Sequence, residues 1–303
     1  MSKNKFIIQK CFSKPLRFME STRHSRISCI NYKSWFRDFC TPKRLLREGS
    51  VLDLRFSTLN SLLSKIYQVK LTLDLKGTIM KTFGTLYVVA TPIGNDADIT
   101  LRAIEILKSV NAVVCEEAKP GSTLLKKLGI EGKELALLNE HNEEEAAADL
   151  LVRLLNGQSL AMISDCGTPV FSDPGSYLIQ LASSSGVTVS PIPGASSLMA
   201  ALSVLDFKMG RFVFAGFLSR EPEKRRNELT RYRTLRIPVV LMDTPYRLGA
   251  LLDDVIKVFG KGIWVTVGYD MTLPTETIYR GEAESVRKQI GPRKGEFIMV
   301  VGN

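Results

Sequence analysis

The stretch Leu86-Tyr-Val-Val-Ala-Thr-Pro-Ile-Gly-Asn95 decides the fold, because an apolar strand-like run ends there in a turn that leads into a helix-like segment. Two later stretches repeat this order: Leu160-Ala-Met-Ile-Ser-Asp-Cys-Gly-Thr-Pro169 and Val187-Thr-Val-Ser-Pro-Ile-Pro-Gly194. Proline and glycine interrupt regular structure sharply, so each stretch predicts a strand, a turn and a helix. Ligands of open α/β sheets bind outside the carboxyl ends of the strands. The three turns therefore predict one ligand-binding cleft.

Strands and helices alternate strictly around these stretches. The expected strands are 85–90, 112–115, 134–138, 159–163 and 187–190, and the expected helices are 99–109, 121–128, 143–156, 174–185 and 195–204. Strict alternation predicts a parallel sheet with helices on both faces. We therefore expect an α/β fold in which residues 80–206 form a parallel-sheet domain.

Short polar residues mark the expected starts of these helices. Either Thr100 or Asp98 caps the first helix, and Asn142 with Glu145 has the pattern of a capping box before the third. Asp173–Pro174 predicts an N-cap followed by the first helical position of the fourth helix.

The second part of the body predicts a different sheet. The expected strands are 211–215, 238–242, 262–267, 276–280 and 297–301, and the expected helices are 222–234, 246–259 and 282–290. Two of these strands, 262–267 and 276–280, follow one another without a helix between them, which predicts a mixed, partly antiparallel sheet. A hinge near 206–210 would separate this second α/β domain, residues 207–303, from the first.

The composition is that of a soluble globular protein: 45% of the 303 residues are hydrophobic and 24% are charged. No apolar run approaches the roughly 20 residues that cross a bilayer. The five cysteines are Cys11, Cys29, Cys40, Cys115 and Cys166, without C-x-x-C spacing. They predict free thiols in a reducing compartment, and hence a cytoplasmic protein. No cluster of His, Cys and Asp has metal-ligand spacing, so we expect no metal.

The net charge of +10 is concentrated in the first 79 residues, which carry 16 Lys and Arg against 5 Asp and Glu. We expect this basic segment to be poorly ordered. Three interpretations stay open: a basic arm that touches nucleic acid, a segment resembling an organelle transit peptide, or upstream sequence joined by a wrong start codon. The third is favoured, because Met80 stands directly before the first convincing strand.

The three turns differ in their chemistry. Thr91–Asn95 has a single glycine and fails both common phosphate-binding patterns, so neither a dinucleotide site nor a nucleoside triphosphate site is indicated. Asp165 follows an apolar strand and could accept from a hydroxyl or an amine, or neutralise a cation; alternatively it only caps backbone amides in an Asx-turn. Gly167 allows close approach of a ligand to the backbone. Gly194 opens a helix of small residues, whose free amides point toward any ligand there.

Cys166 lies between these groups and raises the question of a nucleophile. Neither histidine gives it a partner: His24 lies in the basic segment, and His141 lies in a polar turn. We therefore interpret Cys166 as a small packed thiol.

Five motifs in order carry a resemblance to a known family. They are Thr91–Asn95 with Asp98–Ile99, Ser164–Pro169 with Asp173–Gly175, Pro191–Gly194, Gly216–Leu218 and Arg293–Glu296. Together they resemble the tetrapyrrole methylase superfamily of S-adenosylmethionine-dependent methyltransferases. The branch with the most similar pattern is that of the bacterial 16S ribosomal RNA 2′-O-ribose methyltransferases, which modify a cytidine. The match covers residues 84–302 almost continuously.

The resemblance implies a two-domain enzyme, usually dimeric, that holds S-adenosylmethionine between its domains. A sulfonium cofactor carries no phosphate, which agrees with the missing phosphate motifs. The residues that the resemblance assigns to the cofactor are Pro92, Ile93, Gly94, Asp165, Gly167, Thr168, Gly194, Ala195 and Ser196.

The sequence departs from the ribosomal RNA branch in three places. Glu116–Lys119 stands where that branch tends to carry E-D-T-R, and Asp243–Arg247 where it tends to carry E-S-x-x-R. Tyr269–Leu273 replaces the R-E-L-T-K run. The Asp-Thr-Pro-Tyr-Arg form resembles a less characterised sister branch, so the cofactor positions are better supported than the substrate positions.

A ribose hydroxyl is a poor nucleophile at neutral pH, so a base or a cation near the acceptor would help. The candidate catalytic residues are Arg247, Lys294 and Glu296, and the candidate substrate-binding residues are Glu117, Lys119, Arg225 and Arg226. For each, a solvated charge or an ion pair is an equally good interpretation. The arginines 225, 226 and 233 recur at a spacing that could place them on one helix face.

The expected partners are 16S ribosomal RNA or the small ribosomal subunit, and a second copy of the chain. Three other functions stay open: methylation of a small tetrapyrrole-like molecule, methylation of another RNA or a protein, and binding without activity. The T-P-I-G-N form of the first turn argues against the tetrapyrrole, since the porphyrin enzymes carry a glycine-rich turn there.

Overall fold

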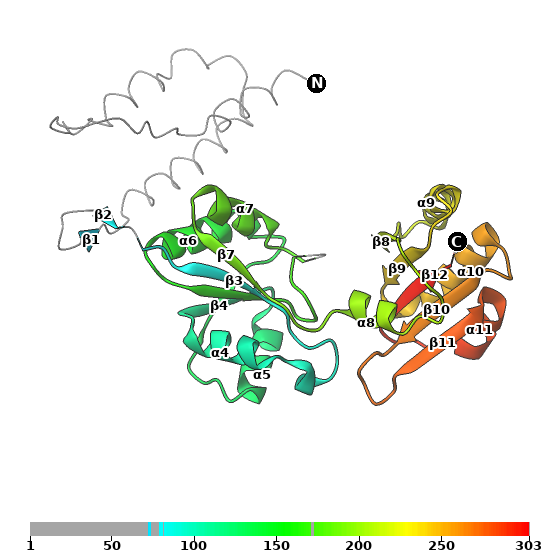
Figure 1. Cartoon of the computed structure of the whole chain (residues 1–303), viewed down its shortest axis with the longest axis horizontal. Coiled ribbons are helices and arrows are strands. Elements are labelled where there is room, and N and C mark those ends of the chain that lie inside the picture. Colours follow the sequence, from blue (N-terminus) through cyan, green and yellow to red (C-terminus); the bar gives the residue numbers. More distant parts are fainter. Residues whose placement is uncertain (1–71, 74–78, 81, 171–172, 303) are drawn as a thin grey trace, which may run out of the picture. The chain divides into compact units, whose positions relative to one another are not determined.

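The structure is a computed structural model that describes residues 72–73, 79–80, 82–170 and 173–302 (Figure 1). Most of the basic segment, and with it our expectations for its order and origin, lies outside the described residues. At the end of that segment, two short strands, β1 (Thr72–Leu73) and β2 (Ile79–Met80, whose second residue lies just past it), pair antiparallel.

The first of two larger sheets contains five strands. They are β3 (Thr85–Val89), β4 (Ala112–Cys115), β5 (Glu134–Leu137), β6 (Leu160–Ile163) and β7 (Thr188–Ile192). Their order in the sheet is β5-β4-β6-β3-β7, and every neighbouring pair is parallel. The predicted parallel sheet is therefore confirmed. The carboxyl ends of β3, β6 and β7, which lie side by side, lead into the three turns that the sequence singled out.

Helices cover both faces of this sheet, as predicted. They are α4 (Leu101–Ser109), α5 (Ala118–Lys127), α6 (Glu143–Leu155) and α7 (Ser176–Ser184). On one face, Leu151 of α6 and Leu178 of α7 pack with Leu86 of β3. On the other face, Leu107 of α4 and Leu125 of α5 pack in a second cluster. Figure 1 shows α6 and α7 on the opposite side of the strands from α4 and α5.

The predicted cap of α4 is confirmed, because the Thr100 hydroxyl accepts a hydrogen bond from the Ala103 amide at 3.1 Å. The predicted capping box of α6 does not form. Its N-cap, Asn142, makes no capping bond; its side-chain oxygen instead accepts from the Asn139 amide at 2.8 Å. That bond closes the polar turn before the helix and leaves the amide side chain unable to cap.

The predicted start of α7 is wrong by two residues. The helix begins at Ser176, and its N-cap is Gly175 with a φ of 123° rather than Asp173. The Glu143 carboxylate, from the neighbouring α6, accepts from the amides of Gly175 and Tyr177 at 2.8 and 3.3 Å. A cap supplied by another helix cannot be read from the local sequence. It leaves Asp173 free to face the ends of the strands.

The second sheet is mixed, as predicted. Its strands are β8 (Val213–Phe217), β9 (Val239–Asp243), β10 (Trp264–Tyr269), β11 (Thr277–Glu282) and β12 (Phe297–Val301). Their order is β11-β10-β12-β9-β8; only β8 and β9 pair in parallel. The helices of this half are α9 (Pro222–Thr234), α10 (Leu248–Phe259) and α11 (Ala283–Ile290), and a short 3₁₀ turn, η3 (Pro245–Arg247), precedes α10. A similar 3₁₀ turn, η2 (Asp96–Asp98), precedes α4 in the first half.

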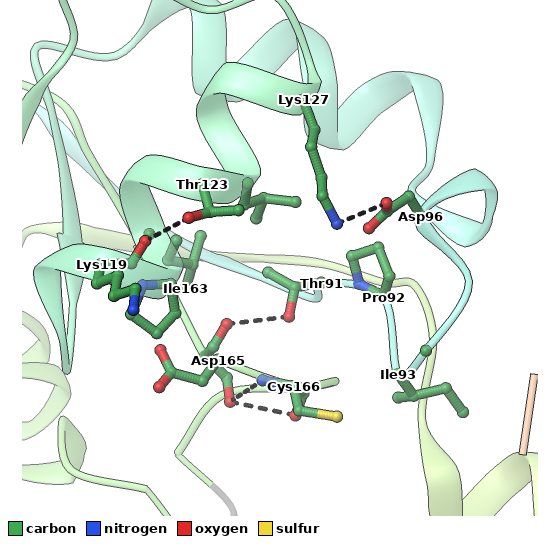
Figure 2. A pocket seen from close by; sticks show the side chains of 15 residues that line it. Thr91, Pro92, Ile93, Asp96, Lys119, Thr123, Lys127, Ile163, Asp165 and Cys166 are labelled. Carbon is green, nitrogen blue, oxygen red and sulfur yellow. Dashed lines mark hydrogen bonds and ion pairs between the residues drawn. The ribbon is translucent and has the colours of Figure 1, made fainter. Parts of the chain in front are cut away.

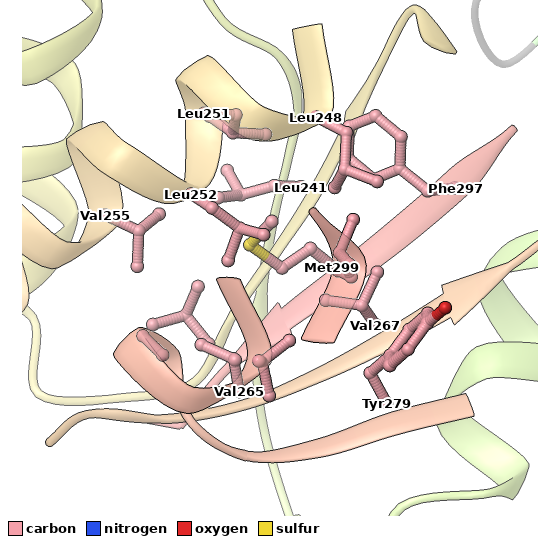
Figure 3. Packing of buried hydrophobic residues seen from close by; sticks show 14 of the residues in the cluster. Leu241, Leu248, Leu251, Leu252, Val255, Val265, Val267, Tyr279, Phe297 and Met299 are labelled. Carbon is pink, nitrogen blue, oxygen red and sulfur yellow. The ribbon is translucent and has the colours of Figure 1, made fainter. Parts of the chain in front are cut away.

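The core of this half lies between the sheet and helices α9, α10 and α11. Leu251 and Leu252 of α10 pack against Leu241, Val265 and Met299 of the strands (Figure 3). All five side chains are at most 1% exposed.

The opposite face of the second sheet is covered by α8 (Ser197–Ser203). Ala201 of this helix is buried in one cluster with Val240, Ile298 and Val300. The Arg280 guanidinium of β11 donates to the carbonyl of Val204, just past the helix, at 2.6 Å. The helix that we predicted as the last of the first domain therefore packs on the second sheet. The boundary near residue 206 stays a prediction.

Candidate functional site

The three turns at the carboxyl ends of β3, β6 and β7 are joined by hydrogen bonds. The buried Thr91 hydroxyl donates to the carbonyl of Ser164 at 3.0 Å and lies 3.2 Å from that of Gly167. The Thr168 hydroxyl donates to the carbonyl of Ala195 at 3.2 Å. The sheet thus brings together the three segments that the sequence predicted to share a site.

Two glycines in these turns are required by their surroundings. Gly167 has a φ of +80°, and a Cβ atom there would lie 3.2 Å from the Ile93 side chain. A Cβ on Gly194 would lie 3.0 Å from the Cβ of Ala90. The positive φ would strain any other residue at position 167, and a Cβ at position 194 would require Ala90 to shift, so both glycines favour close approach of neighbouring turns.

A cavity of about 420 Å³ lies beside the first two turns (Figure 2). Its lining residues are Thr91, Pro92, Ile93, Gly94, Asp96, Lys119, Pro120, Gly121, Thr123, Leu124, Lys127, Ile163, Ser164, Asp165 and Cys166. One wall is formed by the turns after β3 and β6, and the other by helix α5. The volume is typical of a small-molecule site, which spans roughly 300–1,000 Å³.

The predicted cofactor residues divide into two groups. Pro92, Ile93, Gly94 and Asp165 line the cavity. The others, Gly167, Thr168, Gly194, Ala195 and Ser196, do not line it. They lie in the turns after β6 and β7, and the Ser196 hydroxyl caps α8 by accepting from the Met199 amide. The roles of both groups in binding a cofactor stay predictions.

Four carboxylates gather at the carboxyl ends of β4 and β6, and we call them the acidic cluster: Glu116, Glu117, Asp165 and Asp173. Partial burial raises the pKa of Asp165, and the charges of Glu117 and Asp173 raise it further. Burial also raises the pKa of Glu116, with additional contributions from Asp173, Asp165, Glu140 and Glu117. Because like charges oppose one another here, a cation bound near them would relieve the repulsion.

The Asp165 carboxylate takes no hydrogen bond in the part of the chain that the structure describes, so the Asx-turn interpretation finds no support there. The turn is closed by Ser164 instead, whose hydroxyl accepts from the Cys166 amide at 3.2 Å. This leaves the Asp165 side chain available to a ligand in the cavity.

Our interpretation of Cys166 as a small packed thiol is wrong. Cys115 is the packed thiol: it is buried, and burial followed by the charge of Asp165 raises its pKa to about 11. Cys166, which we expected to be packed, is exposed in the cavity wall. Its pKa is also raised, first by partial burial and then by Glu296, Asp173 and Asp165, which disfavours a thiolate nucleophile.

Helix α5 supplies charged residues to the same site. Glu117 is its exposed N-cap residue, and Lys119 lines the cavity from its first turn. Lys127, in its last turn, reaches across to Asp96 of the first turn segment with an N–O distance of 2.7 Å (Figure 2). Sequence reasoning missed Asp96, Thr123 and Lys127. The four-residue spacing of Lys119, Thr123 and Lys127 on one helix was the signal that could have found the last two.

The candidate catalytic residues lie around the carboxyl end of β9 and the amino end of β12. The Arg247 guanidinium pairs with Asp243 at 3.0 Å and donates to the carbonyl of Ser219 at 2.7 Å. Lys294 is exposed, and its ammonium lies 5.2 Å from the ring centre of Tyr246. Partial burial, and secondarily Asp270, raises the pKa of Glu296.

Asp243 is fully buried, and one of its carboxylate oxygens has no hydrogen-bond partner. Burial raises its pKa, although the Thr244 amide and Arg247 act in the opposite direction. The ion pair with Asp243 keeps the Arg247 guanidinium close to the segment Leu218–Ser219.

Of the three arginines predicted to share a face of α9, only Arg225 is buried, whereas Arg226 is partly exposed and Arg233 is exposed. Arg225 is 4% exposed, and its guanidinium pairs with Asp254 of α10 at 2.6 Å. Arg226 pairs with the same carboxylate at 3.3 Å, and Arg233 donates to the carbonyl of Val258. Arg225 is therefore not placed to contact a substrate. Helical spacing indicates a shared face, but only packing decides which face is buried.

The described residues contain neither a cluster suited to a metal ion nor a helix suited to a membrane. No group of three or more His, Cys, Asp and Glu side chains within them could hold a metal ion. None of the helices among them is long and apolar enough to cross a membrane.

Comparisons with known proteins match this chain over most of its described length. The sequence model of the family described as Tetrapyrrole (Corrin/Porphyrin) Methylases matches residues 85–287. Among curated proteins, the ribosomal RNA small subunit methyltransferase I of Leptospira biflexa is 41% identical over 221 residues, which cover 73% of this chain and 91% of that protein. The protein of the same name from Xylella fastidiosa is 38% identical over 226 residues, covering 73% and 82%.

Solved structures share the fold at lower identity. A diphthine synthase superposes with a TM-score of 0.55 at 18% identity, covering 72% of this chain and 88% of that chain. A uroporphyrin-III C-methyltransferase from Thermus thermophilus, solved with S-adenosylhomocysteine, superposes with a TM-score of 0.52 at 17% identity, covering 73% and 98%.

Proposed function

Because this chain belongs to the tetrapyrrole methylase family, we propose that it is an S-adenosylmethionine-dependent methyltransferase that acts on the RNA of the small ribosomal subunit. The observation that carries this proposal is the identity of 36–41% over about 73% of the chain to proteins named ribosomal RNA small subunit methyltransferase I. Within that function, we propose the 2′-hydroxyl of a cytidine ribose in 16S RNA as the methyl acceptor.

The residues around the cavity fit the proposed cofactor. When bound, S-adenosylmethionine supplies an activated methyl group on a positively charged sulfur. The acidic cluster offers negative charge to that cation and to the cofactor's ammonium group. The turn of Pro92, Ile93 and Gly94 forms an apolar wall with exposed backbone, and no phosphate pocket is needed.

Methyl transfer demands mainly orientation from the protein. We assign the binding of the cofactor to the joined turns, since the hydrogen bonds of Thr91 and Thr168 fix their backbones relative to one another. Rigid turns of this kind would hold a bound cofactor in one orientation at little further entropic cost.

The acceptor hydroxyl must lose a proton, and we assign that role to Glu296. Its raised pKa makes it a better proton acceptor than an ordinary surface carboxylate. Arg247, held by Asp243, and Lys294 are proposed to stabilise the negative charge that develops on the ribose oxygen.

The test is in vitro methylation of small ribosomal subunits that lack the modification. Purified protein with labelled S-adenosylmethionine should transfer one methyl group per subunit, and mapping of ribose methylation should find it on a cytidine of the 16S RNA. A protein that binds the cofactor by calorimetry but labels no ribosomal RNA would overturn the proposed substrate. A protein that binds no cofactor would overturn the proposed activity.

The remaining proposals concern the state of the protein in the cell. We propose a cytoplasmic homodimer, on the strength of a cysteine pattern without C-x-x-C spacing and of the family resemblance. Light scattering coupled to size exclusion should give twice the chain mass of 33.7 kDa. A monomer at micromolar concentration would contradict this assignment without affecting the proposed activity.

A further inference from the structure

The α5 wall of the cavity carries two lysines that the cofactor assignment does not use. Lys119, Thr123 and Lys127 line the cavity at four-residue intervals, so they lie on one face of the helix. With a rise of 1.5 Å per residue, the two lysine backbones lie about 12 Å apart along the helix axis. The face therefore presents a row of two cations with a hydroxyl between them.

The two ammonium groups are differently engaged. Lys127 pairs with Asp96 at 2.7 Å, and both side chains are more than half exposed. Such an exposed pair contributes little in water, so a competing anion can replace the carboxylate easily. Lys119 makes no ion pair with any residue that the structure describes.

Acidic and basic side chains of the cavity lie on different walls. Asp165 and the rest of the acidic cluster follow the strands β4 and β6, where they suit a cationic ligand. Lys127 lies two turns further along α5, away from the N-terminal end of the helix where Glu117 stands. The turn wall, with Asp165 and Asp96, thus favours positive charge, and the α5 wall, with Lys119 and Lys127, favours negative charge.

An RNA strand supplies that negative charge, because every ribose in it is flanked by two phosphodiesters. Residues 80–303 carry 25 basic and 26 acidic side chains, so the body has no general excess of positive charge that could hold RNA. Arg225 is buried, and Lys224 is paired with Glu221. Cations placed at the cavity are therefore well suited to fix the backbone of the acceptor strand.

We propose that Lys119 and Lys127 form a phosphate-binding row for the RNA strand that carries the acceptor ribose. A backbone phosphate displaces the Asp96 carboxylate from Lys127, while Lys119 binds a second phosphate nearer to the cofactor. Asp96 thereby acts as a stand-in anion that keeps Lys127 extended across the cavity in the free protein. This inference rests on the proposed function, since it assumes that the substrate is RNA.

The experiment compares Lys119→Gln, Lys127→Gln and the double variant with the control Lys126→Gln. Lys126 is an exposed neighbour on the same helix that does not line the cavity. We measure the KM for unmethylated small subunits, the dissociation constant for a 16S RNA fragment at several salt concentrations, and the affinity for S-adenosylmethionine by calorimetry.

Each single cavity variant should raise the KM about tenfold, as expected for the loss of one charged contact. It should also reduce the slope of log affinity against log salt by about 1. Lys126→Gln should leave both unchanged, and all variants should keep the wild-type affinity for the cofactor. Asp96→Asn, which frees Lys127, should tighten RNA binding severalfold.

Two results would overturn the inference. In one, cavity variants bind the RNA fragment like Lys126→Gln, with the same salt slope. In the other, they lose cofactor affinity while RNA binding is unchanged, which would assign the lysines to the cofactor's carboxylate. If the wild-type protein methylates no ribosomal RNA, that result counts against the proposed function instead. The RNA affinities of the lysine variants would then still test whether Lys119 and Lys127 bind phosphate.

Discussion

Asp165 combines three properties that a cation-binding carboxylate needs. It lines the cavity, it accepts no hydrogen bond from the described residues, and its pKa is raised by partial burial and by its acidic neighbours. A raised pKa means that the free site resists carrying its full negative charge. A bound cation removes that resistance, so ligand binding and proton release are linked at this residue.

Asp165→Asn should weaken the affinity for S-adenosylmethionine about tenfold at pH 7, because a charged contact becomes a neutral one. In the wild type, affinity should fall as the pH is lowered through the raised pKa of Asp165, and the variant should lose part of this dependence. Calorimetric titrations between pH 4.5 and 8 measure both effects. If the wild type and Asp165→Asn bind S-adenosylmethionine with equal affinity at neutral pH, Asp165 does not contact a positive charge of the cofactor.

The same variant should stabilise the protein in the absence of the cofactor. Since the folded state binds the Asp165 proton more tightly than the unfolded state, this residue's contribution to stability is fully present below its unfolded pKa. That contribution is lost as the pH rises through the raised folded pKa. Asp165→Asn should therefore have a higher Tm than the wild type at pH 7 and a smaller difference at pH 4, as measured by thermal unfolding. A lower Tm for the variant at pH 7 would mean that the carboxylate has a stabilising partner.

The reactivity of the Cys166 thiol can report whether the cavity is occupied. It is exposed in the wall, whereas Cys115 is buried with a pKa of about 11. Iodoacetamide at pH 8.5 should alkylate Cys166 but not Cys115 in the folded protein, and saturating S-adenosylhomocysteine should slow the reaction at Cys166. Peptide mass spectrometry distinguishes the two sites. Unaltered alkylation in the presence of the ligand would separate Cys166 from the cofactor site.

At the scale of the element, the position of α5 depends on one close contact. Gly121 is buried where the helix crosses β4, and a Cβ atom there would lie 2.9 Å from the Cys115 sulfur. The missing side chain lets the cavity wall approach the sheet. This contact explains why a helix carrying glycine and proline in its first turns is nevertheless well placed.

Gly121→Ala should destabilise the protein by about 1–3 kcal/mol through overpacking, even though alanine is the better helix former. It should also weaken binding of both cofactor and RNA, since the α5 wall must move. The double variant Gly121→Ala with Cys115→Ala removes the clashing sulfur and should recover most of the loss. Chemical denaturation measures both. A single variant as stable as the wild type would show that α5 adjusts freely.

Helices α9 and α10 are joined by the buried pair Arg225–Asp254, in which both side chains are at most 5% exposed. Asp254→Ala leaves a buried guanidinium without its partner and should cost about 3–5 kcal/mol of unfolding free energy. Glu221→Ala breaks the exposed Lys224 pair on the same helix and should cost less than about 1 kcal/mol. Equal effects in urea denaturation would contradict the structural role of the buried pair.

At the scale of the whole molecule, the residues assigned to the cofactor all lie between 91 and 196, far along the chain from the basic first 79 residues. The charge excess and the proposed site are therefore carried by different parts of the chain. The chain from Met80 should bind S-adenosylmethionine with the affinity of the full chain, as judged by calorimetry. More than a tenfold loss would give the basic segment a role in the site.

The sequence by itself determined the order of the elements and the segments that form the site. Patterns such as 222–234 and 297–301 coincide with α9 and β12, because period and punctuation are local properties. The three turns were found for the same reason. Parallel pairing then follows from strict alternation. Each helix returns the chain to the end of the sheet where the previous strand began, so successive strands run in the same direction.

Only the tertiary structure decided which side chains meet. It assigned the cap of α7 to Glu143 of another helix, buried Arg225 against Asp254, and packed α8 on the second sheet. It also brought Asp96, from the segment after β3, into the same cavity as Lys119 and Lys127 of α5. Such contacts join residues that are far apart in sequence. They depend on which face of each helix the packing buries, and local sequence leaves that choice open.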